Sequence, residues 1–151
     1  MLSETITLES IQIGVEANSF EDAIQKSLEP MVQQEYVQRR YVDEVIKIYN
    51  ETGPYIVITK NIALPHAPSS KGANKMGIGF TKLREPVVSG SKANDPVKYL
   101  FPLSAPDSTA HIQLLSELAD LLGDTAFIEL LGKVETKEEF INILKKFEGN
   151  D

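Results

Sequence analysis

The run Tyr55-Ile56-Val57-Ile58-Thr59 consists entirely of β-branched and aromatic residues. Such residues favour extended backbone, and an apolar run without polar alternation is typical of a strand buried on both faces. A strand of this kind needs packed structure above and below it. The run therefore predicts a sheet with a covering layer on each side.

The flanking sequence supplies both the other strands and the covering helices. Further extended segments are expected at residues 11–15, 76–81, 86–88 and 97–103. Helical spacing of apolar residues follows a cap at Ser19, and recurs over residues 35–50, 114–122, 125–131 and from Thr136 onward. Because strands and helices occur in mixed order, we expect an α/β (α+β) fold, with a mixed central sheet flanked by helices on both faces.

Prolines and connections shape the remaining expectations. Pro30 should kink or end the first long helix near Leu28 or Glu29, or lie in the first turn of another helix. Residues 60–75 are expected to form a long connection, since they contain Pro65 and Pro68. No internal repeat or linker divides the chain, so residues 1–151 are expected to form one domain.

Composition excludes several classes of function. The chain has 151 residues and a formal net charge of −7, which argues against binding nucleic acid or an anionic membrane surface. No apolar run approaches the roughly 20 residues of a membrane-spanning helix, and the first residues do not resemble a signal peptide. Cysteine is absent, which excludes disulfides and thiol nucleophiles. We expect a cytoplasmic protein that does not insert into a membrane.

The chain has two histidines, His66 and His111, and imidazole is the side chain whose ordinary pKa lies near neutral pH. His66 lies in the run Ile62-Ala63-Leu64-Pro65-His66-Ala67-Pro68. Because proline fixes its own φ and restricts the preceding residue, this run predicts a stiff arm that presents one imidazole. The alternative is a surface histidine without a role. The two histidines lack the spacing of a metal site, so neither a metal nor a cofactor is expected.

His111 precedes Leu114, Leu115, Leu118 and Leu122 at helical spacing, which places it in the first turn of the expected helix and on its apolar stripe. The N–H groups and positive potential of a helix N-terminus favour an anion such as phosphate. The alternative is a partly buried core histidine that is bonded to a carbonyl. Asp107, Ser108 and Thr109 can each cap this helix; Ser108 and Thr109 could instead donate to a bound phosphate, although capping is the favoured use.

Two segments carry a family resemblance: Gly53-Pro54-Tyr55-Ile56-Val57-Ile58 and Ile62-Ala63-Leu64-Pro65-His66-Ala67. They resemble the active-site segment of the enzyme IIA domains of the bacterial phosphoenolpyruvate-dependent sugar phosphotransferase system. The branch is the mannitol/fructose type, and within it the likeness is greatest to ascorbate-specific components. The likeness continues through Asn94-Asp95-Pro96-Val97 and His111-Ile112-Gln113-Leu114-Leu115. It implies the fold of that branch.

The resemblance also implies a phosphotransferase that works as a relay. His66 would accept a phosphoryl group on Nε2 from the carrier protein HPr and pass it to a cysteine of an enzyme IIB domain. The membrane component IIC then uses it to phosphorylate ascorbate or a related sugar or polyol. His111 would stabilise the phosphoryl group. One alternative is a regulatory, nitrogen-type module that binds partners according to its phosphorylation state, and another is a binding domain with an unreactive His66.

The sequence departs from the family pattern in its positive charge. The arginine expected near Lys47-Ile48-Tyr49-Asn50-Glu51 is absent, and Pro68 stands where ascorbate-type members usually have an arginine. The negative charge of the phosphoryl group would then be stabilised by His111, backbone N–H groups, Ser69 or Lys75. We also expect partners to bind an apolar rather than a charged patch around the His66 loop, because the apolar residues 62–65 lead into the histidine.

Overall fold

A computed structural model describes residues 1–148 of the chain. Its main element is a five-stranded mixed sheet in the order β1-β5-β6-β3-β2. The pairs β1–β5 and β3–β6 are parallel, whereas β5–β6 and β2–β3 are antiparallel. The strands are β1 Ile11–Val15, β2 Val57–Thr59, β3 Ile62–Ala63, β5 Phe80–Val87 and β6 Val97–Leu100. A separate small sheet pairs β4 Gly77–Ile78 with β7 Leu103–Ser104.

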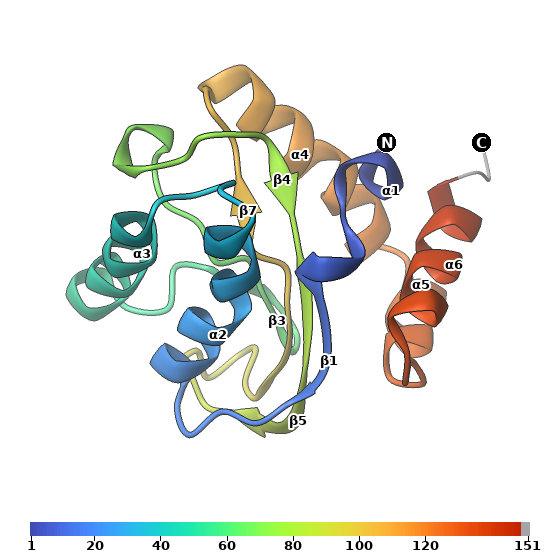
Figure 1. Cartoon of the computed structure of the whole chain (residues 1–151). Helices are drawn as coiled ribbons and strands as arrows, with labels where there is room; N and C mark the ends of the chain where they lie inside the picture. The colour runs from blue at the N-terminus through green and yellow to red at the C-terminus, as the bar shows by residue number, and fades with distance from the viewer. Residues whose placement is uncertain (149–151) are drawn as a thin grey trace.

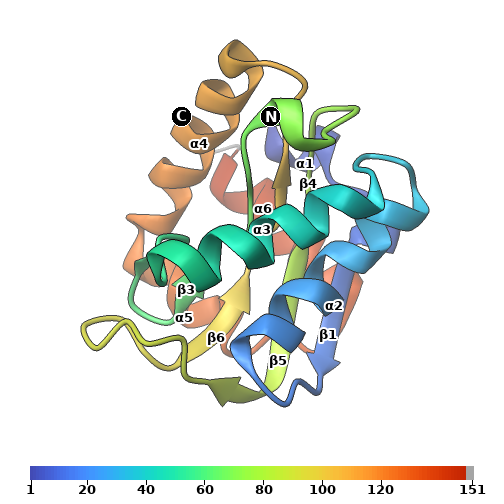
Figure 2. The same ribbon diagram turned by 90° about the vertical axis from the view of Figure 1, so that its left-hand side faces the viewer.

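Helices cover the sheet on both faces, as Figures 1 and 2 show. On one face, α2 and α3 enclose a core cluster with Leu28, Val45 and Ile56. On the other, α1, α4, α5 and α6 enclose a second cluster that includes Phe80 and Phe140. The helices are α1 Leu2–Thr5, α2 Phe20–Gln33, α3 Arg39–Thr52, α4 Ser108–Leu122, α5 Thr125–Leu131 and α6 Lys137–Glu148. Two 3-10 turns occur at Leu8–Ser10 (η1) and Ser69–Lys71 (η2). The predicted fold class is confirmed.

Local sequence signals locate several helix starts. The Ser19 hydroxyl accepts a hydrogen bond from the Asp22 N–H, and the Thr136 hydroxyl accepts one from the Glu139 N–H. Both contacts satisfy N–H groups that a helix leaves free in its first turn, so these residues end the preceding loop and begin the helix.

The expectation of a strand buried on both faces at residues 55–59 is wrong. This run forms only the three-residue strand β2, which lies at the edge of the sheet, and Ile58 is 47% exposed. The strand buried between two neighbours is β3, inside the segment that the sequence predicts to be a connection. Two residues are too few for a hydrophobic period to be recognised.

Pro30 also departs from expectation, because α2 continues through it to Gln33. Proline cannot donate to the carbonyl of the residue four positions earlier, here Lys26. The Gln12 side-chain amide donates to that carbonyl instead, at 2.8 Å, from the neighbouring strand β1. A tertiary contact therefore replaces the missing helical hydrogen bond.

We predict that Pro30→Ala raises the free energy of unfolding by about 1 kcal/mol. Proline costs about 3 kcal/mol relative to alanine inside a helix, but its restriction of the unfolded chain offsets up to about 1 kcal/mol, and the Gln12 contact that replaces the missing hydrogen bond offsets about another 1 kcal/mol. Urea unfolding measures the change, with Gln25→Ala, an exposed substitution on the same helix, as the control. A Pro30→Ala protein no more stable than the parent would contradict this account.

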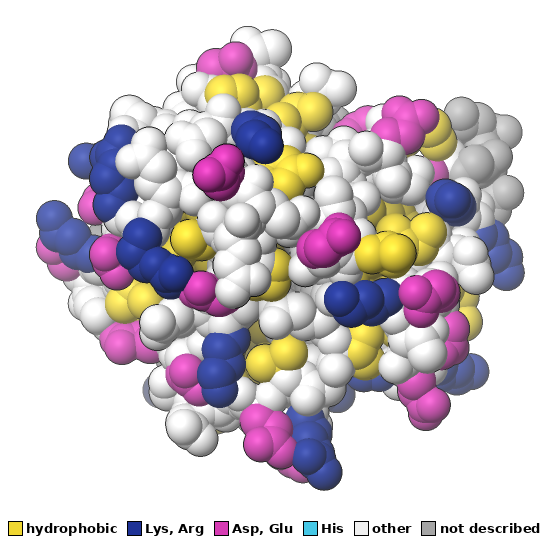
Figure 3. Space-filling view, viewed as in Figure 1, with side chains coloured by type: hydrophobic (Ala, Val, Ile, Leu, Met, Phe, Trp, Pro, Cys, Tyr) yellow, Lys and Arg dark blue, Asp and Glu magenta, His cyan; other side chains and the backbone are white. Residues whose placement is uncertain are grey.

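Charged side chains of both signs are interspersed over the face shown in Figure 3. Within residues 1–148, none of the helices has both the length and the apolar character needed to cross a membrane.

Candidate active site

His66 lies at the end of an arm that hydrogen bonds hold in place. The arm continues from β3, where the Phe101 N–H donates to the Ala63 carbonyl at 2.9 Å. One step further, the Leu103 N–H donates to the Pro65 carbonyl, also at 2.9 Å. The ladder thus reaches the residue directly before His66, and the predicted stiff arm has a physical basis in these bonds as well as in proline.

The imidazole of His66 is oriented by its own main chain. Nδ1 lies 2.5 Å from the carbonyl oxygen of Leu64. A carbonyl oxygen only accepts hydrogen bonds, so we assign the proton to Nδ1, which leaves the lone pair on Nε2. Burial lowers the pKa of His66 below its ordinary value, and the neighbouring His111 acts in the same direction. The ring is therefore neutral at pH 7, with Nε2 available as a nucleophile.

His111 lies beside His66, although the two residues are far apart in the sequence. Their ring centroids are 5.2 Å apart, with the ring planes at 61°. Both rings line a hollow of about 380 Å³. Its other lining residues are Ile48, Tyr55, Ala67 and Pro68. The loop motif with His66 and the helix α4 with His111 thus contribute to one concave, largely apolar hollow.

The first turn of α4 positions His111. Asp107 is the N-cap, and its carboxylate accepts from the Ala110 N–H at 2.9 Å, so Ser108 and Thr109 do not serve as caps. The main-chain N–H of His111 donates to the Asp107 carbonyl at 3.1 Å within this first turn. The His111 side chain is half-buried and faces the His66 ring. It can therefore donate a hydrogen bond to a group attached to His66.

The other two predicted contacts lie outside this hollow. Ser69 is half-buried and begins η2, three residues after His66. Lys75 is exposed, and its ammonium nitrogen lies 5.1 Å from the centre of the Tyr36 ring, in a different hollow beside α2 and α3. Within residues 1–148, no lysine or arginine lines the His66 hollow.

Residues 62–65, on which the expected apolar patch was based, are buried and contribute no surface to it. They belong to the bonded arm and to the core. Apolar surface near the histidines comes instead from Tyr55, which is 37% exposed, from Pro68 and from Ile112, which is 67% exposed.

Two tyrosines that the sequence reasoning did not single out contact this loop. Tyr41 is buried on α3, and its hydroxyl lies 3.0 Å from the Ala67 nitrogen. The Tyr55 hydroxyl donates to the His66 carbonyl. A tyrosine on the buried stripe of a helix needs a partner for its hydroxyl, and this was the available signal for Tyr41.

Comparisons with known proteins agree on the kind of protein. Residues 4–147 match the model of the family described as "Phosphoenolpyruvate-dependent sugar phosphotransferase system, EIIA 2". The ascorbate-specific PTS system EIIA component of Salmonella choleraesuis is 27% identical over 91% of this chain and 90% of its own. The Escherichia coli component of the same name is 25% identical over the same shares.

Solved structures show the same likeness. The mannitol-specific cryptic phosphotransferase enzyme IIA of Escherichia coli is 27% identical, with a TM-score of 0.88 over 96% of this chain and 98% of its own. Enzyme IIA of the mannitol system of Escherichia coli, solved in complex with phosphorylated enzyme IIB, is 26% identical. Its TM-score is 0.80 over 93% of this chain and 99% of its own.

Proposed function

This chain belongs to the EIIA 2 family of the phosphoenolpyruvate-dependent sugar phosphotransferase system, and from that premise we propose that its phosphoryl acceptor is Nε2 of His66. The donor is phosphorylated HPr, and the recipient is the cysteine of a cognate enzyme IIB, which serves a membrane component IIC. The transported compound is ascorbate or a related sugar or polyol, in line with the names of the curated relatives. Under this proposal residues 1–151 act as one cytoplasmic EIIA domain.

The hydrogen bond between His66 Nδ1 and the Leu64 carbonyl carries this proposal. It selects the tautomer with a free lone pair on Nε2, and burial keeps the ring neutral. A histidine without a role would need neither a fixed tautomer nor a second histidine ring 5.2 Å away.

The transfer needs little more than position and charge. The Nε2 lone pair of His66 attacks the phosphorus atom of the donor phosphohistidine. A new N–P bond forms while the donor N–P bond breaks, and its electron pair returns to the donor ring. Positive charge develops on the His66 ring, which strengthens the hydrogen bond from Nδ1–H to the Leu64 carbonyl. The IIB thiolate then attacks phosphorus, and the lone pair returns to Nε2.

The equatorial phosphoryl oxygens need donors, since such a transition state is stabilised mainly by electrostatics. His111 is the proposed donor, because its ring faces His66. Ser69 is a further proposed contact. Lys75 would have to leave the Tyr36 ring to take part.

Incubation with phosphorylated HPr, followed by intact-mass measurement, tests the proposal. Gain of one phosphoryl group on His66, then its loss to a panel of IIB domains, is the expected result. A phosphorylated chain that discharges to no IIB domain would favour the regulatory alternative. Failure to gain any phosphoryl group would favour an unreactive binding domain.

The pH dependence of acceptance follows from the pKa of His66. Only neutral imidazole attacks phosphorus, and burial lowers this pKa, so the neutral form persists to more acidic pH than in a free histidine. We predict that the rate decreases toward acidic pH with an inflection below pH 6.5, the ordinary pKa of histidine. Mass spectra of reactions quenched at successive times between pH 5 and 8 measure this rate. The intrinsic decay of phosphorylated HPr, recorded at each pH, is the control. An inflection above pH 6.5 would contradict the assigned burial effect.

A further inference from the structure

The peptide unit between His66 and Ala67 is held at both of its polar groups by phenol hydroxyls. On one side, the Tyr55 hydroxyl donates to the His66 carbonyl at 2.5 Å. On the other, the Tyr41 hydroxyl accepts from the Ala67 N–H at 3.0 Å. Because these two groups belong to one planar unit, the two contacts together fix the plane.

Tyr41 also connects the two loops of the site. Its hydroxyl donates its own proton to the Leu103 carbonyl at 2.9 Å. Leu103 belongs to β7, and the chain runs from β7 directly into α4 with His111. The single buried hydroxyl of Tyr41 thus links the His66 loop to the segment that carries the second histidine.

Both hydroxyls remain protonated under working conditions. Burial raises the pKa of Tyr41 to about 12, and it does the same for Tyr55. The Tyr55 ring also lies edge-on to the His66 imidazole, with centroids 5.8 Å apart, and it lines the same hollow. Rotation of the peptide unit would therefore break one contact on each side and displace the imidazole from its place.

We propose that Tyr41 and Tyr55 are positioning residues that fix the His66–Ala67 peptide plane and thereby aim Nε2 of His66 into the hollow. The effect on transfer rests on the proposed function, whereas the effect on the ring itself does not. With the peptide plane held and Nδ1 bonded to the Leu64 carbonyl, the imidazole has one orientation. Misplacement of a reacting atom by about 1 Å costs about 100-fold in rate.

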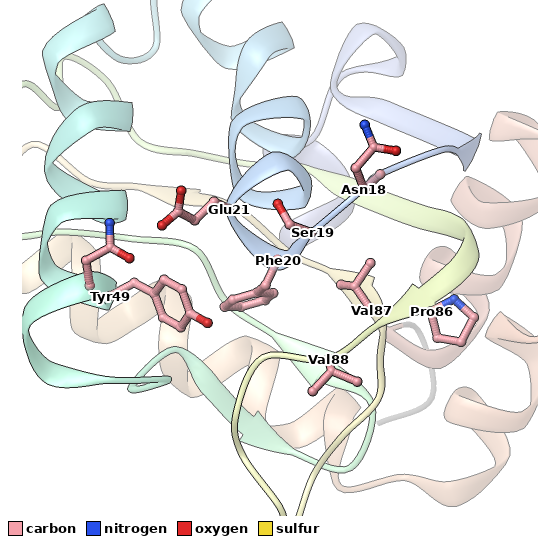
Figure 4. A pocket seen from close by; sticks show the side chains of 10 residues that line it. Asn18, Ser19, Phe20, Glu21, Tyr49, Pro86, Val87 and Val88 are labelled. Carbon is pink, nitrogen blue, oxygen red and sulfur yellow. The ribbon is translucent and has the colours of Figure 1, made fainter.

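Removal of single hydroxyls tests the proposal. Tyr41→Phe and Tyr55→Phe each delete one contact and keep the ring. The matched control is Tyr49→Phe, because the Tyr49 hydroxyl donates to the Ser89 carbonyl at 2.6 Å in the same chemical arrangement. Figure 4 shows Tyr49 beside Phe20, in a hollow separate from the one that His66 lines.

Two readouts are taken on each folded variant, with melting temperature as the check of folding. The first is the single-turnover rate of acceptance at saturating phosphorylated HPr, expected to decrease about 10- to 100-fold in Tyr41→Phe and Tyr55→Phe and less than twofold in Tyr49→Phe. The second is the ¹⁵N spectrum of His66. It should show the Nδ1–H tautomer in the parent and in Tyr49→Phe, and a mixture of tautomers in the other two variants.

The outcomes distinguish the positioning role of Tyr41 and Tyr55 from the proposed phosphoryl transfer. The proposal would be overturned if Tyr41→Phe and Tyr55→Phe had the same rate and the same His66 tautomer as Tyr49→Phe. It would also be overturned if their rate decreased while the tautomer stayed unchanged, since that would indicate direct contact with the phosphoryl group. A mixed tautomer with an unchanged rate would also overturn it. If the parent accepts no phosphoryl group, the proposed function fails, and the ¹⁵N spectra alone then decide whether the tyrosines position the ring.

Discussion

Replacing His66 with alanine is expected to abolish phosphoryl acceptance. The chain contains no cysteine that could substitute, and the proposed nucleophile is the Nε2 lone pair of His66, which the Nδ1 contact with the Leu64 carbonyl leaves free. Removal of a covalent nucleophile differs from removal of a stabilising contact, because no other group then forms the intermediate. The measurement is intact mass after incubation with phosphorylated HPr.

The control is the fold of the variant. His66 is half-buried, so its loss can affect packing, and an unchanged far-ultraviolet spectrum and cooperative melting transition would show that the site alone has changed. The decisive contrary result is a phosphoryl group on His111 in His66→Ala. The rings are 5.2 Å apart, so His111 is the one other imidazole within reach of the donor, and such a product would exchange the two roles.

The fold class was predictable because its signals are local and repeated. Caps such as Ser19 and Thr136 mark helix starts by their own side chains, and periodic apolar residues mark the faces that become buried. The strand order is not a local property. β3 is only two residues long and owes its place to hydrogen bonds from β6 and β2, which no window around Ile62 contains.

Pro30 shows the same limit in a single residue. Its local chemistry indicates a helix break, but the helix continues, and Gln12 of another element donates to the Lys26 carbonyl that Pro30 cannot reach with an N–H. In the site, the motif identified His66, but the pairing with His111 depends on how β7 leads into α4. Neither tyrosine was singled out: the position of Tyr41 on the buried stripe of its helix indicates that its hydroxyl needs a partner, but the main-chain group that serves as partner lies in another segment.

Replacing His111 with alanine is expected to slow phosphoryl acceptance by about 10- to 150-fold without abolishing it. His111 faces the His66 ring and can donate one hydrogen bond to a phosphoryl oxygen on Nε2. A hydrogen bond to a charged group contributes about 1.5–3 kcal/mol, and the stated range follows if the bond acts only in the transition state. The nucleophile itself remains, so the phosphorylated product should still accumulate.

The structural alternative for His111 makes its own distinct prediction. His111 is half-buried and lies on a helix whose residues Leu114 and Leu115 pack in the core, so its loss could act through stability. A rate loss at an unchanged melting temperature assigns the effect to the phosphoryl group, and His111→Gln should recover part of the rate because its amide keeps a donor. Gln113→Ala, an exposed change two residues along α4, should leave the rate unaltered. Equal rates for His111→Ala and the parent would remove His111 from the site, because a donor that touches the transferring group cannot be deleted without cost.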